Sequence, residues 1–87
     1  MSNIEKEITI MNKQGLHARP AAMFVQIVQK YDSEITVQKG NEKVNGKSIM
    51  GILMLGIQHK NTITIIVEGN DSEQMMAELE EYLSKDE

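Results

Sequence analysis

The sequence contains no cysteine and no tryptophan, and it has only one proline and one phenylalanine. Without cysteine, a disulfide scaffold, thiolate metal sites and thiol chemistry are all excluded, which fits a reducing compartment. With only two histidines as well, we expect no structural zinc site and no cofactor. The 3% aromatic content and the net charge of −4 also argue against a nucleic-acid partner, which calls for stacking rings and positive charge.

Long hydrophobic runs are absent as well. No stretch approaches the roughly 18 apolar residues of a membrane span, and the charged residues 1–7 lack the apolar centre of a signal peptide. We therefore expect a cytoplasmic protein that is not inserted in a membrane. The 87 residues suit a single domain, 1–87, with a small core, so a functional site must lie near the surface.

Four segments show the period-two alternation of half-buried strands. They are a first run through Ile4, Ile8 and Ile10, a second at Ile35 and Val37, a short third at Lys43–Val44, and a fourth over residues 62–68. Gly15, Gly40 and Gly69 interrupt these runs, as glycines in turns do.

Three segments show a helical period instead. The first begins at about His17, with Pro20 in its first turn, and the second is short, with Ser48 as its N-cap and Gly56 at its end. The third begins at about Asp71, which forms the spacing of a capping box with Gln74 three residues later. Their predicted core residues are Ala21, Phe24, Val25 and Val28, then Ile52 and Leu55, and finally Met76, Leu79 and Leu83.

The resulting order is β-α-β-β-α-β-α, which predicts an α+β fold. With too few strands for a barrel, and with alternating strands that leave one face wet, we expect a four-stranded antiparallel sheet with three helices on one face.

The candidate reactive residues lie in segment 15–21, where His17 stands at the start of a helix directly after a glycine turn. The first N–H groups of a helix have no intrahelical partner and the helix dipole is positive there, so this end attracts anions. Arg19 adds a cation. Histidine suits phosphoryl transfer because its ordinary pKa of about 6.5 leaves much of it neutral and nucleophilic.

Less specific explanations exist for the same residues. A histidine at a helix start is commonly a cap or a surface residue, and an anion-binding helix end needs no covalent chemistry. A pure binding module therefore remains an alternative. A small enzyme is disfavoured, because no carboxylate pair, metal cluster or nucleophile–base pair is evident.

The segment from Gly15 to Ala21 resembles the active-site motif of HPr, the histidine-containing phosphocarrier family of the bacterial sugar phosphotransferase system. A second motif, Lys47 to Gly51, stands at the family's spacing from the histidine, and the resemblance covers nearly the whole chain. It implies an open-faced β-sandwich and a phosphocarrier that is a substrate of other enzymes and has no turnover of its own. Some relatives have replaced the histidine and lost relay activity, whereas this chain retains the histidine.

By this resemblance, enzyme I charged by phosphoenolpyruvate phosphorylates His17 on Nδ1, and a sugar-specific enzyme IIA accepts the group. Arg19 matches the arginine that pairs with the phosphoryl group. Ser48 matches the serine that a kinase/phosphatase modifies in many Gram-positive members, and a transcriptional regulator is a further implied partner. Ile49, Met50 and Leu53 match the family's docking face, which suits the adaptable side chain of methionine.

Three further expectations concern the role of the protein, its assembly and the second histidine. The alternative within the family is a regulatory or nitrogen-branch paralogue that uses the same chemistry without serving sugar uptake. Nothing in the sequence demands more than a monomer. We predict that the remaining histidine, His59, lies in an exposed polar turn without function.

Overall fold

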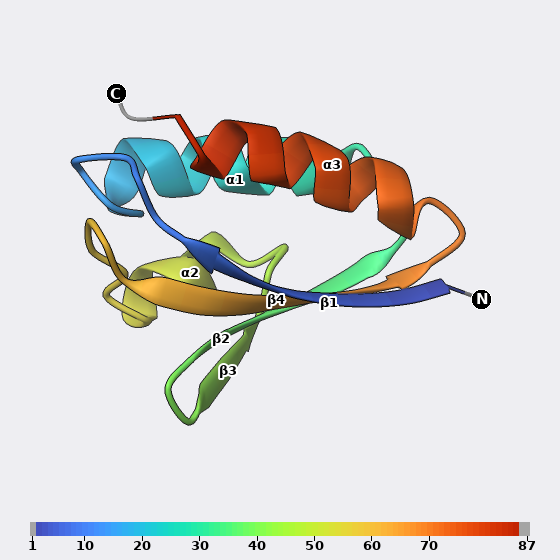
Figure 1. Cartoon of the computed structure of the whole chain (residues 1–87), viewed down its shortest axis with the longest axis horizontal. Coiled ribbons are helices and arrows are strands. Elements are labelled where there is room, and N and C mark those ends of the chain that lie inside the picture. The colour runs from blue at the N-terminus through green and yellow to red at the C-terminus, as the bar shows by residue number, and fades with distance from the viewer. Residues whose placement is uncertain (1, 86–87) are drawn as a thin grey trace.

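The computed structural model describes residues 2–85, and Figure 1 shows a four-stranded sheet with three helices on one face. The elements, in chain order, are β1 (Ser2–Thr9), α1 (Ala18–Gln29), β2 (Glu34–Lys39), β3 (Glu42–Asn45), α2 (Ile49–Met54), β4 (Thr62–Gly69) and α3 (Ser72–Leu83). This is the predicted order, and the open-faced α+β architecture is confirmed.

The sheet has the strand order β1-β4-β2-β3, and every neighbouring pair is antiparallel. Val67 of β4 pairs with Ile4 on one side and with Ile35 on the other, so the apolar positions of three strands share one face. The opposite face carries polar side chains such as Thr36 and Thr64. This alternation is the one that the sequence predicts.

Helices α1 and α3 lie side by side over the sheet in Figure 1, and each buries the face predicted for it. Pro20 occupies the first turn of α1, where its missing N–H costs no intrahelical hydrogen bond. Val25 is half-buried against the core, and Met75 adds a buried side chain that the sequence pattern did not single out. No helix among residues 2–85 has both the length and the hydropathy needed to cross a membrane.

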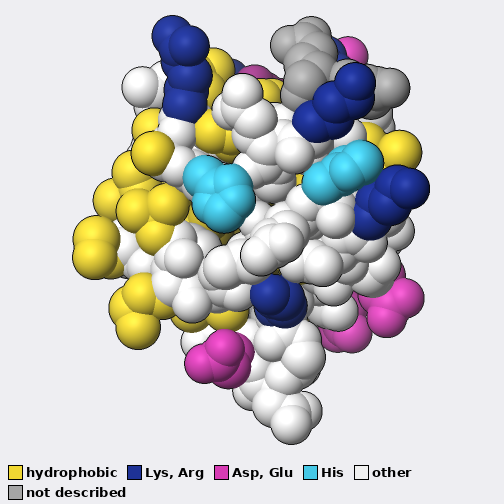
Figure 2. All heavy atoms as spheres, turned by 90° about the vertical axis from the view of Figure 1, so that its left-hand side faces the viewer, with side chains coloured by type: hydrophobic (Ala, Val, Ile, Leu, Met, Phe, Trp, Pro, Cys, Tyr) yellow, Lys and Arg dark blue, Asp and Glu magenta, His cyan; other side chains and the backbone are white. Residues whose placement is uncertain are grey.

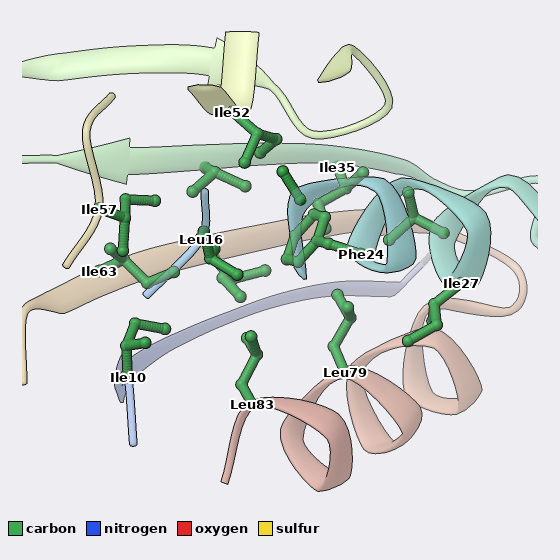
Figure 3. Close-up of a cluster of buried hydrophobic side chains, with 14 of the residues drawn as sticks. Ile10, Leu16, Phe24, Ile27, Ile35, Ile52, Ile57, Ile63, Leu79 and Leu83 are labelled. Atoms are coloured by element: carbon green, nitrogen blue, oxygen red, sulfur yellow. The ribbon is translucent and has the colours of Figure 1, made fainter. Parts of the chain in front are cut away.

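Among the core residues outside the regular elements, three fix the loop that follows β1. Ile10, Leu16 and Ile57 are fully or almost fully buried, and Figure 3 shows them within the hydrophobic cluster. Ile10 was predicted as part of the first strand, but β1 ends at Thr9. The Ile10 N–H donates to the Asn61 carbonyl at 2.9 Å and its own carbonyl accepts from the Lys60 N–H at 2.7 Å. The loop is therefore fastened to the turn before β4.

The capping box predicted at the start of α3 is wrong. Asp71 is the N-cap, but its side chain makes no hydrogen bond to the helix. Its carboxylate instead accepts the N–H groups of Asp32 and Ser33, both at 2.9 Å, together with the Ser33 hydroxyl. The loop after α1 offers unpaired donors close by, so the carboxylate braces that loop against α3. Spacing within one segment gives no sign of such a long-range partner.

These contacts predict an acid-sensitive contribution of Asp71 to stability. The Ser33 hydroxyl and the Asp32 N–H hold the pKa of the Asp71 carboxyl below its usual 3.8. A carboxyl whose pKa is lower in the folded state stabilises the fold above its unfolded-state pKa, and that contribution is lost as the pH falls through the folded value. Asp71→Asn should lower the urea midpoint at pH 7, and its difference from the parent should shrink below about pH 3.8.

Glu81→Gln is the matched control, because Glu81 is an exposed carboxylate of α3 without an ion pair among residues 2–85. Its urea midpoint should stay with that of the parent from pH 7 to pH 3. A constant difference between Asp71→Asn and the parent across this range would show that the brace does not depend on the charge.

Candidate functional site

His17 is the N-cap of α1, with extended backbone angles of φ −82° and ψ −158°. Its carbonyl accepts the Ala21 N–H at 2.8 Å and so begins the helix through the main chain. The imidazole is exposed and makes no capping hydrogen bond. A histidine that serves only as a cap would use its ring for that bond, so the ring here is left available to an incoming group.

The backbone donors nearest to His17 are also available. Neither the Ala18 nor the Arg19 N–H has an acceptor in the part of the chain that the structure describes, and Pro20 has no N–H. The first turn of α1 carries no acidic side chain. Two free amides therefore stand at the positive end of a 12-residue helix with no carboxylate in that turn to compete for them.

Arg19 is exposed and forms no ion pair with any residue between 2 and 85. Together with Pro20 it lines a shallow hollow on the surface, which Lys85 also borders. Two cations thus flank an open depression beside the start of α1. A guanidinium that is not engaged by a carboxylate can make charge-assisted hydrogen bonds to a phosphoryl group.

The two residues before His17 are fixed in place by contacts with the backbone around Ile57. The Leu16 side chain is buried, and its N–H donates to the Ile57 carbonyl at 3.0 Å. Gly15 has a φ of +65°, and a Cβ built on it would lie 2.5 Å from that same carbonyl oxygen. Only glycine combines this backbone angle with so close an approach. The turn therefore fixes where the chain enters α1.

Ser48 lies where the second motif predicts it, as the N-cap of α2. Its hydroxyl is partly exposed and accepts the Gly51 N–H at 3.0 Å, which confirms the predicted cap. The Lys39 ammonium closes the other end of this short helix through the carbonyls of Leu55 and Gly56, at 3.1 and 3.0 Å. Both ends of α2 are thus satisfied by side chains, and its place is well defined.

The three residues predicted to form a docking face differ in exposure. Met50 is 63% exposed and Ile49 is 39% exposed, whereas Leu53 is half-buried and packs against the core. Ile52 is buried on the other side of the helix, as predicted. Met54 was missed, although at 77% it is the most exposed apolar side chain of this group. Its spacing of four from Met50 could have identified it, since such residues share a helix face.

Figure 2 views the molecule from the end where α1 begins, and both histidine side chains are exposed on this face. Hydrophobic side chains gather along one side of the view, and several cationic side chains surround the histidines. His59 lies in the exposed turn predicted for it. Among residues 2–85, no group of three His, Asp or Glu side chains is arranged to hold a metal ion.

The chain matches known proteins over nearly its whole length. The family described as "PTS HPr component phosphorylation site" matches residues 4–85. The HPr-like protein Crh of Halalkalibacterium halodurans is 46% identical over 83 residues, covering 95% of this chain and 99% of that protein. The crystal structure of the phosphocarrier protein HPr from Bacillus anthracis superposes with a TM-score of 0.92 at 39% identity, covering 97% of this chain and all of that one.

A further solved structure bears on assembly. It is an HPr dimer from Thermoanaerobacter tengcongensis, with a TM-score of 0.69 at 53% identity and 83% of each chain covered. A dimeric relative does not fit the monomer expected from the sequence, so that expectation stays a prediction for this chain.

Proposed function

This chain belongs to the HPr family of phosphocarrier proteins, and from that premise we propose that it carries a phosphoryl group on His17. Phosphorylated enzyme I is the donor, and a sugar-specific enzyme IIA domain is the acceptor. The protein works in the cytoplasm as one domain, and the residues assigned to the relay lie in a single chain. In each cycle the chain is phosphorylated by one protein and dephosphorylated by the next, and it does not itself turn over a substrate.

The single observation that carries the proposal is the unused imidazole of His17 beside two free backbone N–H groups. The lone pair of Nδ1 forms the new N–P bond while the bond between phosphorus and the donor breaks. Ala18 and Arg19 then offer N–H donors to the phosphoryl oxygens. Phosphoryl transfer depends mostly on positioning and charge stabilisation, which a shallow surface site can supply.

A labelling experiment tests the relay directly. The chain is incubated with enzyme I and 32P-labelled phosphoenolpyruvate, and an enzyme IIA domain is then added. We expect one acid-labile phosphoryl group on the chain, which moves to the added domain. If the chain acquires no label, the anion-binding module without covalent chemistry becomes the better explanation. If it acquires label but never releases it to any IIA domain, the transport role fails.

We predict that Arg19→Ala slows both acceptance and donation of the phosphoryl group by about 10- to 100-fold, the range expected for one lost charge-assisted hydrogen bond. Because Arg19 is exposed and has no ion pair within the described chain, the thermal midpoint should not change. Rapid-quench transfer rates and thermal unfolding measure the two effects. Lys13→Ala is the control, since it removes an exposed cation of the loop before α1 and should keep parental rates. Parental rates for Arg19→Ala would remove Arg19 from the mechanism.

We predict that Ser48 regulates docking through charge. Ser48→Asp places a carboxylate beside the exposed Ile49 and Met50, so acceptance from enzyme I should fall about tenfold. Ser48→Ala removes the hydroxyl that caps Gly51 and should cost about 1 kcal/mol of stability with little change in the transfer rate. If the two variants transfer phosphoryl groups equally well, the role of Ser48 is confined to capping.

A regulatory role is the second candidate, favoured by the 46% identity to an HPr-like Crh protein. In that case a kinase modifies Ser48, and the modified chain binds a transcriptional regulator instead of feeding transport. The histidine at position 17 favours the relay, because a purely regulatory protein has no need of that ring. Transfer to IIA domains, measured against binding of a regulator to the Ser48-phosphorylated chain, separates the two roles.

A further inference from the structure

The methionines of this chain fall into two sharply different classes. Of the six methionines among residues 2–85, two are buried in the core and four are exposed. The exposed fractions are 0% for Met75 and 2% for Met76, against 38% for Met11, 43% for Met23, 63% for Met50 and 77% for Met54. An oxidant in solution therefore reaches the exposed sulfurs without entering the core.

The two most exposed methionines lie together on α2. Met50 and Met54 are four residues apart, so they are neighbours on one face of the helix, opposite the buried Ile52. The helix is anchored independently of them, through Ile52 in the core and through the Lys39 ammonium, which donates to the two carbonyls directly after the helix. A chemical change at the two thioethers can therefore alter the surface while the fold remains intact.

We propose that Met50 and Met54 form a redox-sensitive modification site, whose oxidation to methionine sulfoxide weakens docking of the phosphoryl donor. The oxidant class is a hydroperoxide, with hydrogen peroxide as the simplest member. A sulfur lone pair attacks the terminal peroxide oxygen, the O–O bond breaks, and water leaves after proton transfer. The sulfur loses two electrons and the peroxide gains them, so the step needs no other reactant.

Oxidation weakens docking because it makes the two methionine side chains polar. A thioether is an adaptable apolar contact, whereas a sulfoxide carries a strongly polar oxygen that must be desolvated when a partner covers it. Because the chain contains no cysteine, no thiol of its own competes for the oxidant. This inference rests on the proposed function, since it assigns regulation to the docking face of the same relay.

The experiment uses the full chain treated with hydrogen peroxide and compares phosphoryl acceptance from enzyme I before and after treatment. Mass mapping should find sulfoxide first at positions 50 and 54, with Met75 and Met76 unchanged. The acceptance rate should fall about tenfold, the effect of burying one unpaired polar group. Methionine sulfoxide reductases should restore it, and circular dichroism should show a folded protein throughout.

Two variants make the assignment specific. In Met50→Leu/Met54→Leu, which keeps apolar side chains on α2, the treated and untreated rates should agree. In Met11→Leu/Met23→Leu, the tenfold loss should persist because the thioethers of α2 remain. The inference is overturned if oxidation at positions 50 and 54 leaves the rate unchanged, or if the loss accompanies unfolding. If the untreated chain accepts no phosphoryl group, it is the proposed function that fails.

Discussion

His17→Ala is expected to lose all phosphoryl acceptance from enzyme I while keeping the fold and stability of the parent. The side chain is exposed and caps nothing, because the start of α1 is made by the His17 carbonyl and not by the ring. Alanine keeps that carbonyl, so the Ala21 hydrogen bond at 2.8 Å survives. No other side chain among residues 2–85 stands at the start of α1 with a nucleophilic nitrogen. We expect a loss beyond the detection limit of the assay.

The matched control is His59→Ala. His59 is an exposed histidine in the turn before β4, without a helix N-terminus behind it, and Figure 2 shows both rings on the same face. Its replacement should leave acceptance at the parental rate. Intact-mass spectra taken at neutral pH measure the phosphoryl gain in both variants. If His17→Ala still gains a phosphoryl group, and this gain disappears only in the double variant His17→Ala/His59→Ala, then His59 is the acceptor.

Gly15→Ala is expected to cause the largest loss of stability of any single change at the site. Its φ of +65° disfavours a side chain, and the added Cβ would meet the Ile57 carbonyl oxygen at 2.5 Å and the Gln58 Cα at 2.8 Å. Both are backbone atoms and cannot rotate away. The left-handed angle costs about 1–2 kcal/mol and the overpacking about 1–3 kcal/mol, so we expect a loss of about 2–5 kcal/mol in the free energy of unfolding.

Relief of this clash also has a functional cost. The Ile57 carbonyl is the acceptor of the Leu16 N–H, so moving it shifts the residue directly before His17. We therefore expect Gly15→Ala to slow phosphoryl acceptance even where the protein stays folded. Urea unfolding and the transfer rate at low temperature measure the two effects separately.

Gly40→Ala separates backbone strain from crowding. Gly40 has nearly the same φ, +61°, but an added Cβ would find no atom within 4 Å. Only the cost of the left-handed angle remains, about 1–2 kcal/mol, and the turn between β2 and β3 lies away from α1. Equal destabilisation by the two substitutions would show that the turn before His17 tolerates a side chain.

The sequence predicted the regular elements well because each carries its own periodic signal. The strand containing Ile63, Ile65 and Val67 and the helix face containing Leu79 and Leu83 are examples in which local pattern and tertiary burial agree. The start of α1 at His17 and the Ser48 cap were also predicted, since residue preferences at helix ends act locally.

Apart from Met54, which its helix spacing could have identified, the misses have a different cause. Asp71 pairs with Ser33, which is 38 positions away, and the buried loop residues Leu16 and Ile57 owe their place to a backbone contact between distant turns. No periodic pattern covers such contacts. Leu53 was assigned to the docking face by resemblance to the family, but it is half-buried because a six-residue helix lying on a core exposes only part of its circumference. Long-range geometry, and not residue preference, decided each of these.

The most direct test of the central claim is the 1H–15N correlation spectrum of the labelled chain, recorded before and after phosphorylation by enzyme I and phosphoenolpyruvate. We expect the largest shifts at the His17 ring nitrogens and at the Ala18 and Arg19 amides, whose N–H groups lack acceptors in the described chain. Shifts centred on His59, or a phosphorylated His17 whose neighbouring amides do not respond, would contradict this claim.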